Sequence, residues 1–393
     1  MTTVIYGGSF NPPHLGHVSA AQSGYEALRP DRFLIIPTNI APHKAAAAGS
    51  PDAAARLQMC RLAFAGIPGA EVSPMEMERE GKSYTADTIS ILREKYPEDE
   101  LYLVVGTDMF LSFREWHEYK YLLDNCTLAV LSRETDDRGE ILSFKRSLEN
   151  EDGAHIRLID HEPLPMSSAE IRAMLPKAGG AELLDDGVYS LIIKNRWYAA
   201  KPELRWLREK VRPYLTEKRA RHVAGCEEQA VKLARRWGAD VYEAAEAGIL
   251  HDITKKLSDE EQLIMCDKYG IILDAAERRN PRILHARTGA ALARELFGIP
   301  DGIYSAIRWH TTGKPDMSLM EKIIYLADFT EPTRDFEGVE PLRKLCFEDI
   351  DRAMELGLRM SLEEIRSRGE DAYKDTVDAY QWYKKEQGGS ATC

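Results

Sequence analysis

Apolar residues in the first half of the chain form short runs, separated by longer segments in which apolar positions recur with helical spacing. We expect buried strands at these runs, which are Thr3–Tyr6, Arg32–Ile36, Leu101–Val105, Leu128–Leu131 and Ile156–Ile159. Short apolar runs that alternate with helical segments are typical of a parallel sheet whose strands are joined by crossover helices. The first half of the chain is therefore predicted to have an α/β fold.

The pattern changes around Pro202, beyond which almost no segment alternates with a period of two. Amphipathic helical patterns dominate from there to about Lys385, and the residues after it resemble a frayed end. We place the boundary between two domains near residues 198–203. The first domain is expected over residues 1–199, and an all-α domain over residues 203–388.

One loop in the first half combines several features of a phosphate-binding site. The segment GGSFNPPHLGHV (residues 7–18) follows the first predicted strand and leads into a helix that we expect to start near Leu15. Its glycines let the backbone approach a ligand closely, and a helix N-terminus directs free N–H groups and a positive dipole end toward the loop. His14 and His17 lie on one side of the first helical turn. An HxxH pair alone would be weak support, but these features together predict a phosphate-binding loop.

Six potential metal ligands recur on apolar faces of the helices predicted for the second half. A single buried histidine is more often a core residue with satisfied hydrogen bonds than a metal ligand. Burying four imidazoles and two carboxylates is costly, however, unless they pair or bind a metal. Imidazole and carboxylate donors without a thiolate suit Fe²⁺, Mn²⁺, Zn²⁺ or Co²⁺. The predicted ligands are His222, His251, Asp252, His285, His310 and Asp328.

Composition narrows the possible partners of this chain of 393 residues, whose formal net charge is −12. Residues 1–200 carry 20 basic and 29 acidic side chains and the remainder carries 32 and 35, so neither half is basic. Because nucleic acids are bound mainly through neutralised phosphates, no nucleic-acid partner is expected. The six cysteines form no CxxC pair, which favours a reduced, cytoplasmic protein. No signal peptide or membrane-length apolar run is recognisable.

The loop over residues 7–18 resembles the HxGH motif of the nucleotidyltransferase superfamily. Over about residues 3–198, further segments occur in the order and spacing of bacterial nicotinate-mononucleotide adenylyltransferases. The resemblance implies a Rossmann-like domain, a parallel sheet with helices on both faces, that transfers the adenylyl group of ATP to nicotinate mononucleotide and yields deamido-NAD and pyrophosphate. The matching segments are PTNIAPHK (37–44), SYTADTI (83–89), GTDMF (106–110), WHEY (116–119) and MSSAEIR (166–172).

The resemblance also implies roles for individual residues. Charge that develops during the transfer would be stabilised by His14, His17, Lys44 and Arg172, with Mg²⁺ on the leaving phosphates. For Ser167 and Ser168 at the start of a predicted helix, a phosphate site and a plain helix cap are equally compatible with the residues, and we expect Arg172 in the first turn of that helix. The implied substrate contacts are Gly7, Gly8, Ser9, Phe10, Tyr84, Thr85, Gly106, Asp108, Trp116, Arg133, Ser167 and Ser168.

The chain departs from this family's pattern at two places. LSRETDD (131–137) stands where many members have Arg-Pro-Gly, and His117 stands where a tyrosine is common. The preference for nicotinate over nicotinamide mononucleotide rests on the resemblance alone. A different acceptor, such as phosphopantetheine or a cytidylyl acceptor, is an open alternative.

The second half resembles the HD superfamily of phosphohydrolases. Over about residues 203–386, the segments RARHVAGC, ILHDITKK and HTTGKPDMSLMEKIIYLADFTEPTR resemble small bacterial HD proteins that hydrolyse diadenosine tetraphosphate symmetrically. The resemblance implies an all-α HD domain and a metal-dependent reaction that releases two ADP. The chain would then be a bifunctional cytoplasmic enzyme acting on small nucleotides; the sequence leaves open whether it forms a homo-oligomer.

This resemblance assigns the six ligands to two divalent transition metals. His222, His251 and Asp328 would hold one metal, His285 and His310 the second, and Asp252 would bridge them. Members of the family are iron proteins, although the donors by themselves do not select iron. Lys255, implied to be catalytic together with Asp252, and Arg334 are candidate phosphate contacts, and ordinary solvated side chains are equally compatible. The second half could also be a metal-bound regulatory module or hydrolyse another nucleotide.

Overall fold

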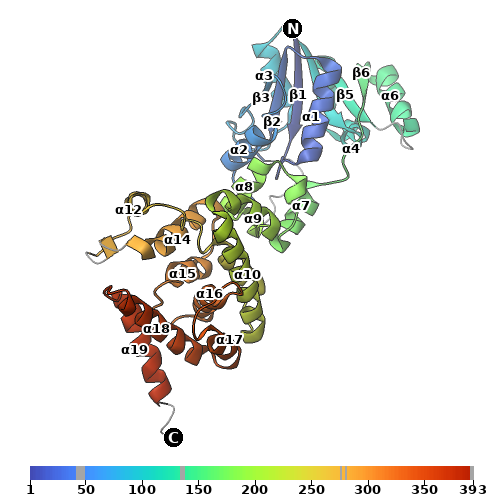
Figure 1. Cartoon of the computed structure of the whole chain (residues 1–393). Coiled ribbons are helices and arrows are strands. Elements are labelled where there is room, and N and C mark those ends of the chain that lie inside the picture. The colour runs from blue at the N-terminus through green and yellow to red at the C-terminus, as the bar shows by residue number, and fades with distance from the viewer. Residues whose placement is uncertain (41–48, 133–137, 275–276, 279–280, 390–393) are drawn as a thin grey trace. The chain divides into compact units, whose positions relative to one another are not determined.

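The chain folds into two compact units, Met1–Lys201 and Pro202–Cys393. Among the described helices, none combines the length and the apolar character that a membrane span requires. The computed structural model (Figure 1) describes residues 1–40, 49–132, 138–274, 277–278 and 281–389.

The first unit contains a six-stranded parallel sheet with the strand order β3-β2-β1-β4-β5-β6. All five predicted strands are confirmed. The strand that the sequence did not reveal, β3, has only three residues at the edge of the sheet, and none of them is fully buried, so it leaves no apolar run. The strands are β1 (Thr2–Gly8), β2 (Arg32–Pro37), β3 (Ala70–Val72), β4 (Glu100–Gly106), β5 (Thr127–Ser132) and β6 (Ile156–Asp160).

Helices cover both faces of this sheet, as predicted. Successive strand residues point to opposite faces: Leu103 and Val105 of β4 pack with α3 and α5, whereas Val104 faces Gly24 of α1, where an added Cβ would lie 3.4 Å from it. The helices of the first unit are α1 (Leu15–Leu28), α2 (Ala53–Ala63), α3 (Thr85–Lys95), α4 (Thr107–Leu111), α5 (Tyr119–Asn125), α6 (Arg138–Asp152), α7 (Ser168–Met174) and α8 (Asp186–Asn195).

The strand order reverses between β1 and β4. The chain crosses from β1 to β2 on one side and later returns to β4 on the other, and in such sheets ligands bind beyond the carboxyl ends of the two central strands. The register pairs Tyr6 of β1 with Val104 of β4. Gly7 and Gly8 at the end of β1 and Gly106 at the end of β4 therefore lie at the same edge of the sheet.

The described residues of the second unit are helical and contain no strand, which confirms the all-α prediction. Its helices are α9 (Leu204–Val211), α10 (Glu217–Trp237), α11 (Val241–Leu250), α12 (Asp259–Lys268), α14 (Leu284–Phe297), α15 (Asp301–Trp309), α16 (Leu319–Thr330), α17 (Val339–Glu348), α18 (Ile350–Ser367) and α19 (Lys374–Gly389). The 3₁₀ helices of the chain are η1 (Phe113–Glu115), η2 (Leu175–Lys177), η3 (Ala181–Leu183), η4 (Trp197–Ala199), η5 (Arg212–Tyr214) and η6 (Pro281–Ile283).

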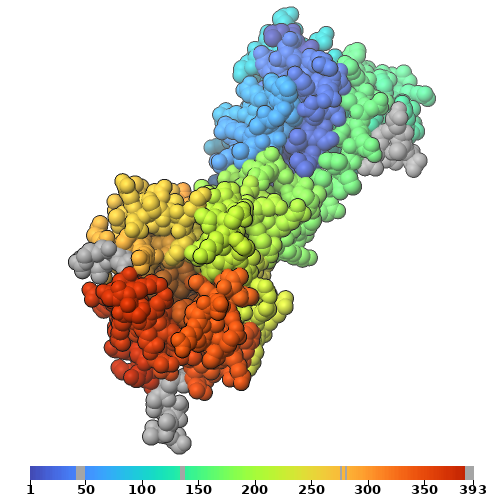
Figure 2. Space-filling view, in the orientation of Figure 1, coloured from blue at the N-terminus to red at the C-terminus, as the bar shows by residue number. Residues whose placement is uncertain are grey.

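Helix α10 packs against both α11 and α16. The contact with α11 is close because a Cβ on Gly248 would lie only 2.8 Å from the backbone of Glu227. Segments that are distant in sequence also meet in this unit: Arg282 of η6 forms an ion pair with Glu370, beyond α18, at 2.9 Å. Figure 2 likewise shows the yellow-green surface of α10 beside the orange surface of later helices. Ligands scattered along the sequence can thus be collected from several helices.

Candidate active sites

A buried aromatic ring shapes the loop that follows β1. Phe10 has a φ of 43° and is fully buried, with its ring edge-on to Tyr6, Phe64 and His17 at centroid distances of 5.6, 5.4 and 5.1 Å. A Cβ at Gly8 would lie 2.9 Å from this ring, so a glycine is needed there. The Phe10 side chain supports the loop, and only its backbone can face a ligand.

The two predicted histidines stand together at the start of α1, which begins at Leu15 as expected. Their ring centroids are 3.7 Å apart, and the backbone N–H of His14 donates to His17 Nδ1 at 3.2 Å. A Cβ on Gly16 would lie 3.0 Å from His14 Nδ1, which explains the glycine between them. His14 Nδ1 is buried without a hydrogen-bond partner among the described residues.

Burial keeps this pair of imidazoles neutral at pH 7. It lowers the pKa of His14 to about 4, and burial together with the neighbouring His14 lowers the pKa of His17 to about 3. A neutral imidazole carries one N–H donor and one acceptor nitrogen. Each ring can therefore offer one hydrogen bond to an anion placed at the helix N-terminus, where the positive end of the α1 dipole lies.

Arg56 of α2 is a buried residue that the sequence analysis did not single out. Its guanidinium donates to the backbone carbonyls of Ser9 at 3.0 Å, Thr38 at 2.6 Å and Asn39 at 2.9 Å. These bonds connect the segments that follow β1 and β2. An arginine in an amphipathic helix usually lies at the surface, so its spacing gave no signal of this role.

Helix α7 holds the loop from the other side. The Ser168 hydroxyl donates to the carbonyl of Pro12 at 2.9 Å, and Arg172 donates to the carbonyl of Asn11 at 2.6 Å. Ser167 caps α7 by accepting a backbone N–H, so both serine hydroxyls are engaged within the protein. The helix starts where predicted, but Arg172 lies in its last turn, not in its first. The expectation of a first-turn arginine was wrong because Arg172 is the fifth residue of a helix of only seven residues.

Two aromatic residues that the resemblance assigns to substrate binding, at a pocket for the pyridine ring, lie near the start of α3 and after η1. Tyr84 precedes Thr85, the first residue of α3, and its ring is 4.3 Å from that of His117. Trp116 is partly buried against Phe113, with ring centroids 5.0 Å apart. The histidine that departs from the family's usual tyrosine thus contacts another residue of the expected pocket.

The remaining substrate contacts predicted in the first unit follow the ends of its strands. Gly106 ends β4 and precedes α4, and both Gly106 and Asp108 are exposed. Asp108 is therefore open to a ligand at the same edge of the sheet as the loop after β1. Lys44 and Arg133 lie outside the described residues.

The second unit brings the six predicted ligands to one place. All except Asp328 are at most 7% exposed, and the Asp328 side chain is 20% exposed. The ligands come from five segments: His222 from α10, His251 and Asp252 after α11, His285 from α14, His310 after α15 and Asp328 from α16.

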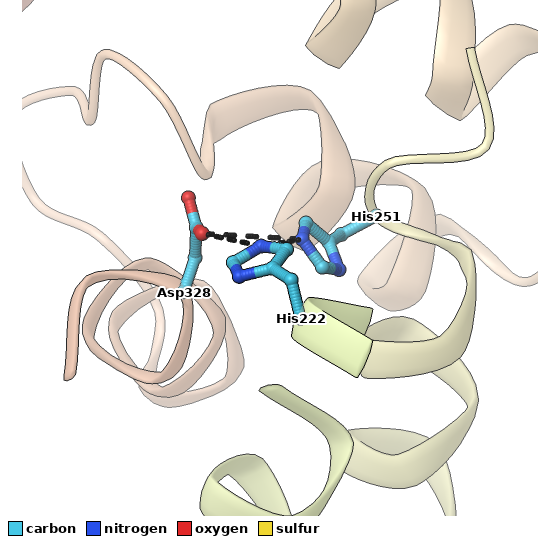
Figure 3. Close-up of side chains that lie close together, drawn as sticks. All are labelled: His222, His251 and Asp328. Atoms are coloured by element: carbon cyan, nitrogen blue, oxygen red, sulfur yellow. Dashed lines mark hydrogen bonds and ion pairs between the residues drawn. The ribbon is translucent and has the colours of Figure 1, made fainter. Parts of the chain in front are cut away.

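Three of these ligands form a compact group (Figure 3). His222 Nε2 lies 3.3 Å from His251 Nε2 and 3.0 Å from Asp328 Oδ1. The three donor atoms all lie within 4.8 Å of one another. Metal–nitrogen and metal–oxygen bonds of about 2.0–2.2 Å separate neighbouring donors by about 3 Å, so the spacing fits one ion with little adjustment.

Asp252 lies between this group and the other two histidines. Its Oδ2 is 3.4 Å from His251 Nε2 and 3.6 Å from His222 Nε2, whereas its Oδ1 is 3.3 Å from His285 Nε2 and 3.7 Å from His310 Nε2. His285 and His310 are 3.2 Å apart through their Nε2 atoms. This is the geometry of a carboxylate that spans two ion positions.

Comparisons with known proteins match the two units separately. Residues 5–174 match the cytidylyltransferase-like family, and residues 219–333 match the HD domain family. The probable nicotinate-nucleotide adenylyltransferase of Gemmatimonas aurantiaca is 39% identical over 170 residues, which cover 43% of this chain and 78% of that protein. The symmetrical bis(5'-nucleosyl)-tetraphosphatase of Bacillus subtilis is 38% identical over 176 residues, 44% of this chain and 92% of that protein.

The chain belongs to the nicotinate-nucleotide adenylyltransferase family in its first unit and to the symmetrical bis(5'-nucleosyl)-tetraphosphatase family in its second. A further relative contains both parts: the probable nicotinate-nucleotide adenylyltransferase/Ap4A hydrolase of Mycoplasma pneumoniae is 25% identical over 365 residues, which cover 91% of this chain and 98% of that protein. The predicted resemblance to a fusion of these two families is confirmed. HD domains bind divalent metals, and the donor groups of this HD domain suit that role.

Cationic side chains surround the ligands of the HD domain. Arg334 lies 2.6 Å from Asp328 Oδ1, and Lys255 Nζ lies 3.2 Å from His285 Nδ1; both were candidates from the sequence. Arg219 was missed, although it pairs with Asp252 Oδ2 at 2.6 Å. Arg219 precedes His222 by three residues, so both side chains lie on one face of α10. This spacing could have indicated that Arg219 lies at the ligand group.

The cations and imidazoles around the two carboxylates keep them ionised. Burial would raise the pKa of Asp252, but His251 and the other histidines hold it well below its usual range. The pKa of Asp328 is lowered in the same way, by His222 and Arg334 against the effect of burial. Burial lowers the pKa of Lys255. Ionised carboxylates are the form that binds a metal. Against the effect of burial, Cys226 and Asp252 raise the pKa of His251 well above its usual value, so metal binding would displace a proton from this ring.

Proposed function

We propose that the chain is a bifunctional cytoplasmic enzyme of dinucleotide metabolism. The first unit transfers the adenylyl group of ATP to nicotinate mononucleotide, forming deamido-NAD and pyrophosphate, and the second hydrolyses diadenosine tetraphosphate to two ADP. The observation that carries this proposal is the Mycoplasma pneumoniae relative, which is named for both activities and matches 91% of the chain. The 38–39% identical relatives of the separate units support each half.

In the first reaction, an oxygen of the nicotinate mononucleotide phosphate attacks the α-phosphorus of ATP, and the bond to the pyrophosphate oxygen breaks. His14 and His17 donate hydrogen bonds to phosphate oxygens at the N-terminus of α1, where the helix dipole adds a positive potential. Arg172 and Lys44 add charge, and Mg²⁺ accompanies the triphosphate. Catalysis then consists of positioning and charge stabilisation, without a covalent enzyme intermediate.

The sheet edge beyond β1 and β4 supplies the binding groups for the nucleosides. Asp108, in the first turn of α4 after β4, accepts hydrogen bonds from a ribose. Trp116 and Tyr84 offer aromatic faces for the pyridine ring, and the ring of His117 lies 4.3 Å from that of Tyr84 at an interplanar angle of 40°. Gly8 lets the loop backbone approach the phosphates.

In the second reaction, water attacks one of the two central phosphorus atoms of diadenosine tetraphosphate, and ADP leaves as the P–O–P bond breaks. Divalent metals, when bound by the six ligands, lower the pKa of a coordinated water and polarise phosphoryl oxygens; we propose iron as the natural metal. Arg219, Lys255 and Arg334 lie around the carboxylates and bind the phosphate chain. Arg219 pairs with Asp252 in this structure, and its guanidinium would be available to phosphate if Asp252 held a metal.

Two assays on one purified protein test the proposal. Nicotinate mononucleotide with ATP and Mg²⁺ is expected to yield deamido-NAD, and diadenosine tetraphosphate with Fe²⁺ or Mn²⁺ is expected to yield ADP as the sole nucleotide product. Elemental analysis after anaerobic purification identifies the metal. Formation of AMP and ATP instead of ADP would reject symmetrical cleavage. If no nucleotide is cleaved and Asp252→Ala changes the adenylyltransferase kinetics, the second unit is a regulatory module.

A further inference from the structure

All four imidazoles of the metal-ligand group direct Nε2 toward the centre. Each therefore needs a hydrogen-bond acceptor for its Nδ1–H. In His251, His285 and His310, Nδ1 lies 2.7–2.8 Å from the backbone carbonyl oxygen three residues earlier. Such a bond places the proton on Nδ1, leaves the Nε2 lone pair free for a metal and fixes the ring orientation. Three of the four rings are therefore positioned by their own backbone.

His222 is held differently because of its place in the fold. His251 and His310 follow the ends of helices, and His285 is the second residue of α14, so nearby carbonyls are available to them. His222 is the sixth residue of α10, where backbone carbonyls accept hydrogen bonds along the helix. Its Nδ1 lies 3.1 Å from Glu331 Oε1 instead, so the acceptor is a carboxylate that comes from the residue after α16.

Glu331 is itself locked in place. It is 1% exposed, and its carboxylate accepts hydrogen bonds from the backbone N–H and the hydroxyl of Thr333 at 2.6 and 2.5 Å. A Cβ on Gly225 would lie 2.4 Å from Glu331 Oε2, so the glycine one turn after His222 makes room for it. A buried carboxylate with this much support is costly to maintain unless its charge is used.

We propose that Glu331 is the positioning residue of the metal site. Its carboxylate accepts the Nδ1–H of His222, fixes the tautomer and makes Nε2 a stronger donor to the ion shared with His251 and Asp328. The ion held by Asp252, His285 and His310 does not depend on this contact. The inference rests on the proposed function in one respect, namely that the six ligands bind two divalent ions.

The direct test measures the binding of Mn²⁺ to metal-free full-length protein by calorimetric titration, without any substrate. Wild-type protein is expected to bind two ions. Glu331→Gln keeps the size of the side chain but removes the charge, and is expected to weaken one of the two binding events by about 10–100-fold, the range typical when a residue that hydrogen-bonds a metal ligand is lost. Glu321→Gln is the matched control: Glu321 is a buried carboxylate of α16 that contacts Ser305 and Lys314, and removal of its charge is expected to leave both events unchanged.

Gly225→Ala provides a second route to the same result. The new methyl group displaces the Glu331 carboxylate while leaving every ligand in place, and it is expected to weaken the same ion. Because both changes act through one contact, the double variant is expected to bind Mn²⁺ no more weakly than Glu331→Gln alone. Circular dichroism of each variant distinguishes loss of the ion from loss of the fold.

Two outcomes separate failure of this inference from failure of the proposed function. Two wild-type binding events that persist unchanged in Glu331→Gln and Gly225→Ala would overturn the positioning role alone. A wild-type protein that binds no Mn²⁺ would overturn the proposed metal site, and the inference with it.

Discussion

The two candidate active sites differ in the charges that they bury. In the first unit, His14 and His17 are kept neutral by burial at a helix N-terminus, and the loop around them is held by hydrogen bonds to backbone carbonyls. In the second unit, two ionised carboxylates stand among four imidazoles in a buried cluster. The first arrangement receives an anion and needs no buried charge of its own, whereas the second is stable only with cations to balance it.

The two sites also differ in how their residues are distributed along the sequence. The phosphate-binding loop is continuous in sequence, so its glycines, prolines and histidines are recognisable together. The metal ligands are distributed over five segments and meet only when the helices pack. A contiguous motif is therefore more tolerant of changes elsewhere in the fold than a cluster whose members depend on several interfaces.

The largest effect is expected from Asp252→Ala. Asp252 faces both pairs of imidazoles, so its loss disturbs both ion positions. Hydrolysis of diadenosine tetraphosphate should fall by more than the about 100-fold that loss of a residue hydrogen-bonded to a metal ligand can cost, while formation of deamido-NAD is unchanged. A variant that keeps hydrolysis within tenfold of the wild type would show that the cluster is not the catalytic centre.

His17→Ala is the reciprocal change in the first unit. It removes one N–H donor from the helix N-terminus, and loss of one such preorganised donor typically lowers kcat by about 10²–10³-fold. Synthesis of deamido-NAD should fall by this amount, and hydrolysis of diadenosine tetraphosphate should not change. Steady-state assays of both reactions on the same preparation measure the two effects; a parallel loss of both activities would contradict the separation of the sites.

Metal removal should destabilise only the second unit. A ligand present at 100 times its Kd stabilises the folded state by about 2.7 kcal/mol, so chelation is expected to lower one calorimetric transition and leave the other in place. Asp252→Ala protein serves as the control, since its melting should respond much less to chelator. Equal shifts of both transitions would argue that the two units unfold together.

The smallest expected effect is the pH dependence of the first unit's stability. The lowered pKa values of His14 and His17, about 4 and about 3, lie below the value of about 6.5 for an unfolded histidine. As the pH falls through the window between these values, the unfolded chain binds more protons than the folded unit, so the free energy of unfolding decreases. Above this window, both states hold the histidines neutral and the first unit keeps its full stability.

His17→Gln should flatten this dependence, because it removes one of the two titrating groups. Urea unfolding between pH 7.5 and pH 5, with the wild type and the variant compared at each pH, measures the difference. Identical slopes in both proteins would mean that His17 is not the buried neutral group described above.

Much of the fold could be predicted because its signals are local. The five apolar runs and the helical second half follow from periodicity, whereas the three residues of β3 bury too little surface to be seen in a pattern. Leu15 and Ser168 were located as helix starts by their neighbours in sequence. Arg172 was placed in the first turn of α7 but lies in its last, since the pattern did not reveal that this helix has only seven residues.

Only some residues of the candidate sites could be predicted from the sequence. Side chains that carry chemistry by type, such as the four histidines, stand out in the sequence. Arg56, Arg219 and Glu331 do not, because their roles are set by what they contact: three carbonyls, a ligand carboxylate and a ligand imidazole. Common charged residues acquire such roles only through tertiary packing, which periodicity does not reveal.

One measurement tests the contrast between the two units most directly: anomalous diffraction from crystals of the full chain grown with Mn²⁺ and without nucleotide. We expect two anomalous peaks in the second unit, with Asp252 between them. One should lie beside His222, His251 and Asp328, and the other beside His285 and His310. No peak is expected at the His14–His17 pair. A peak at that pair, with none among the six ligands, would contradict this account.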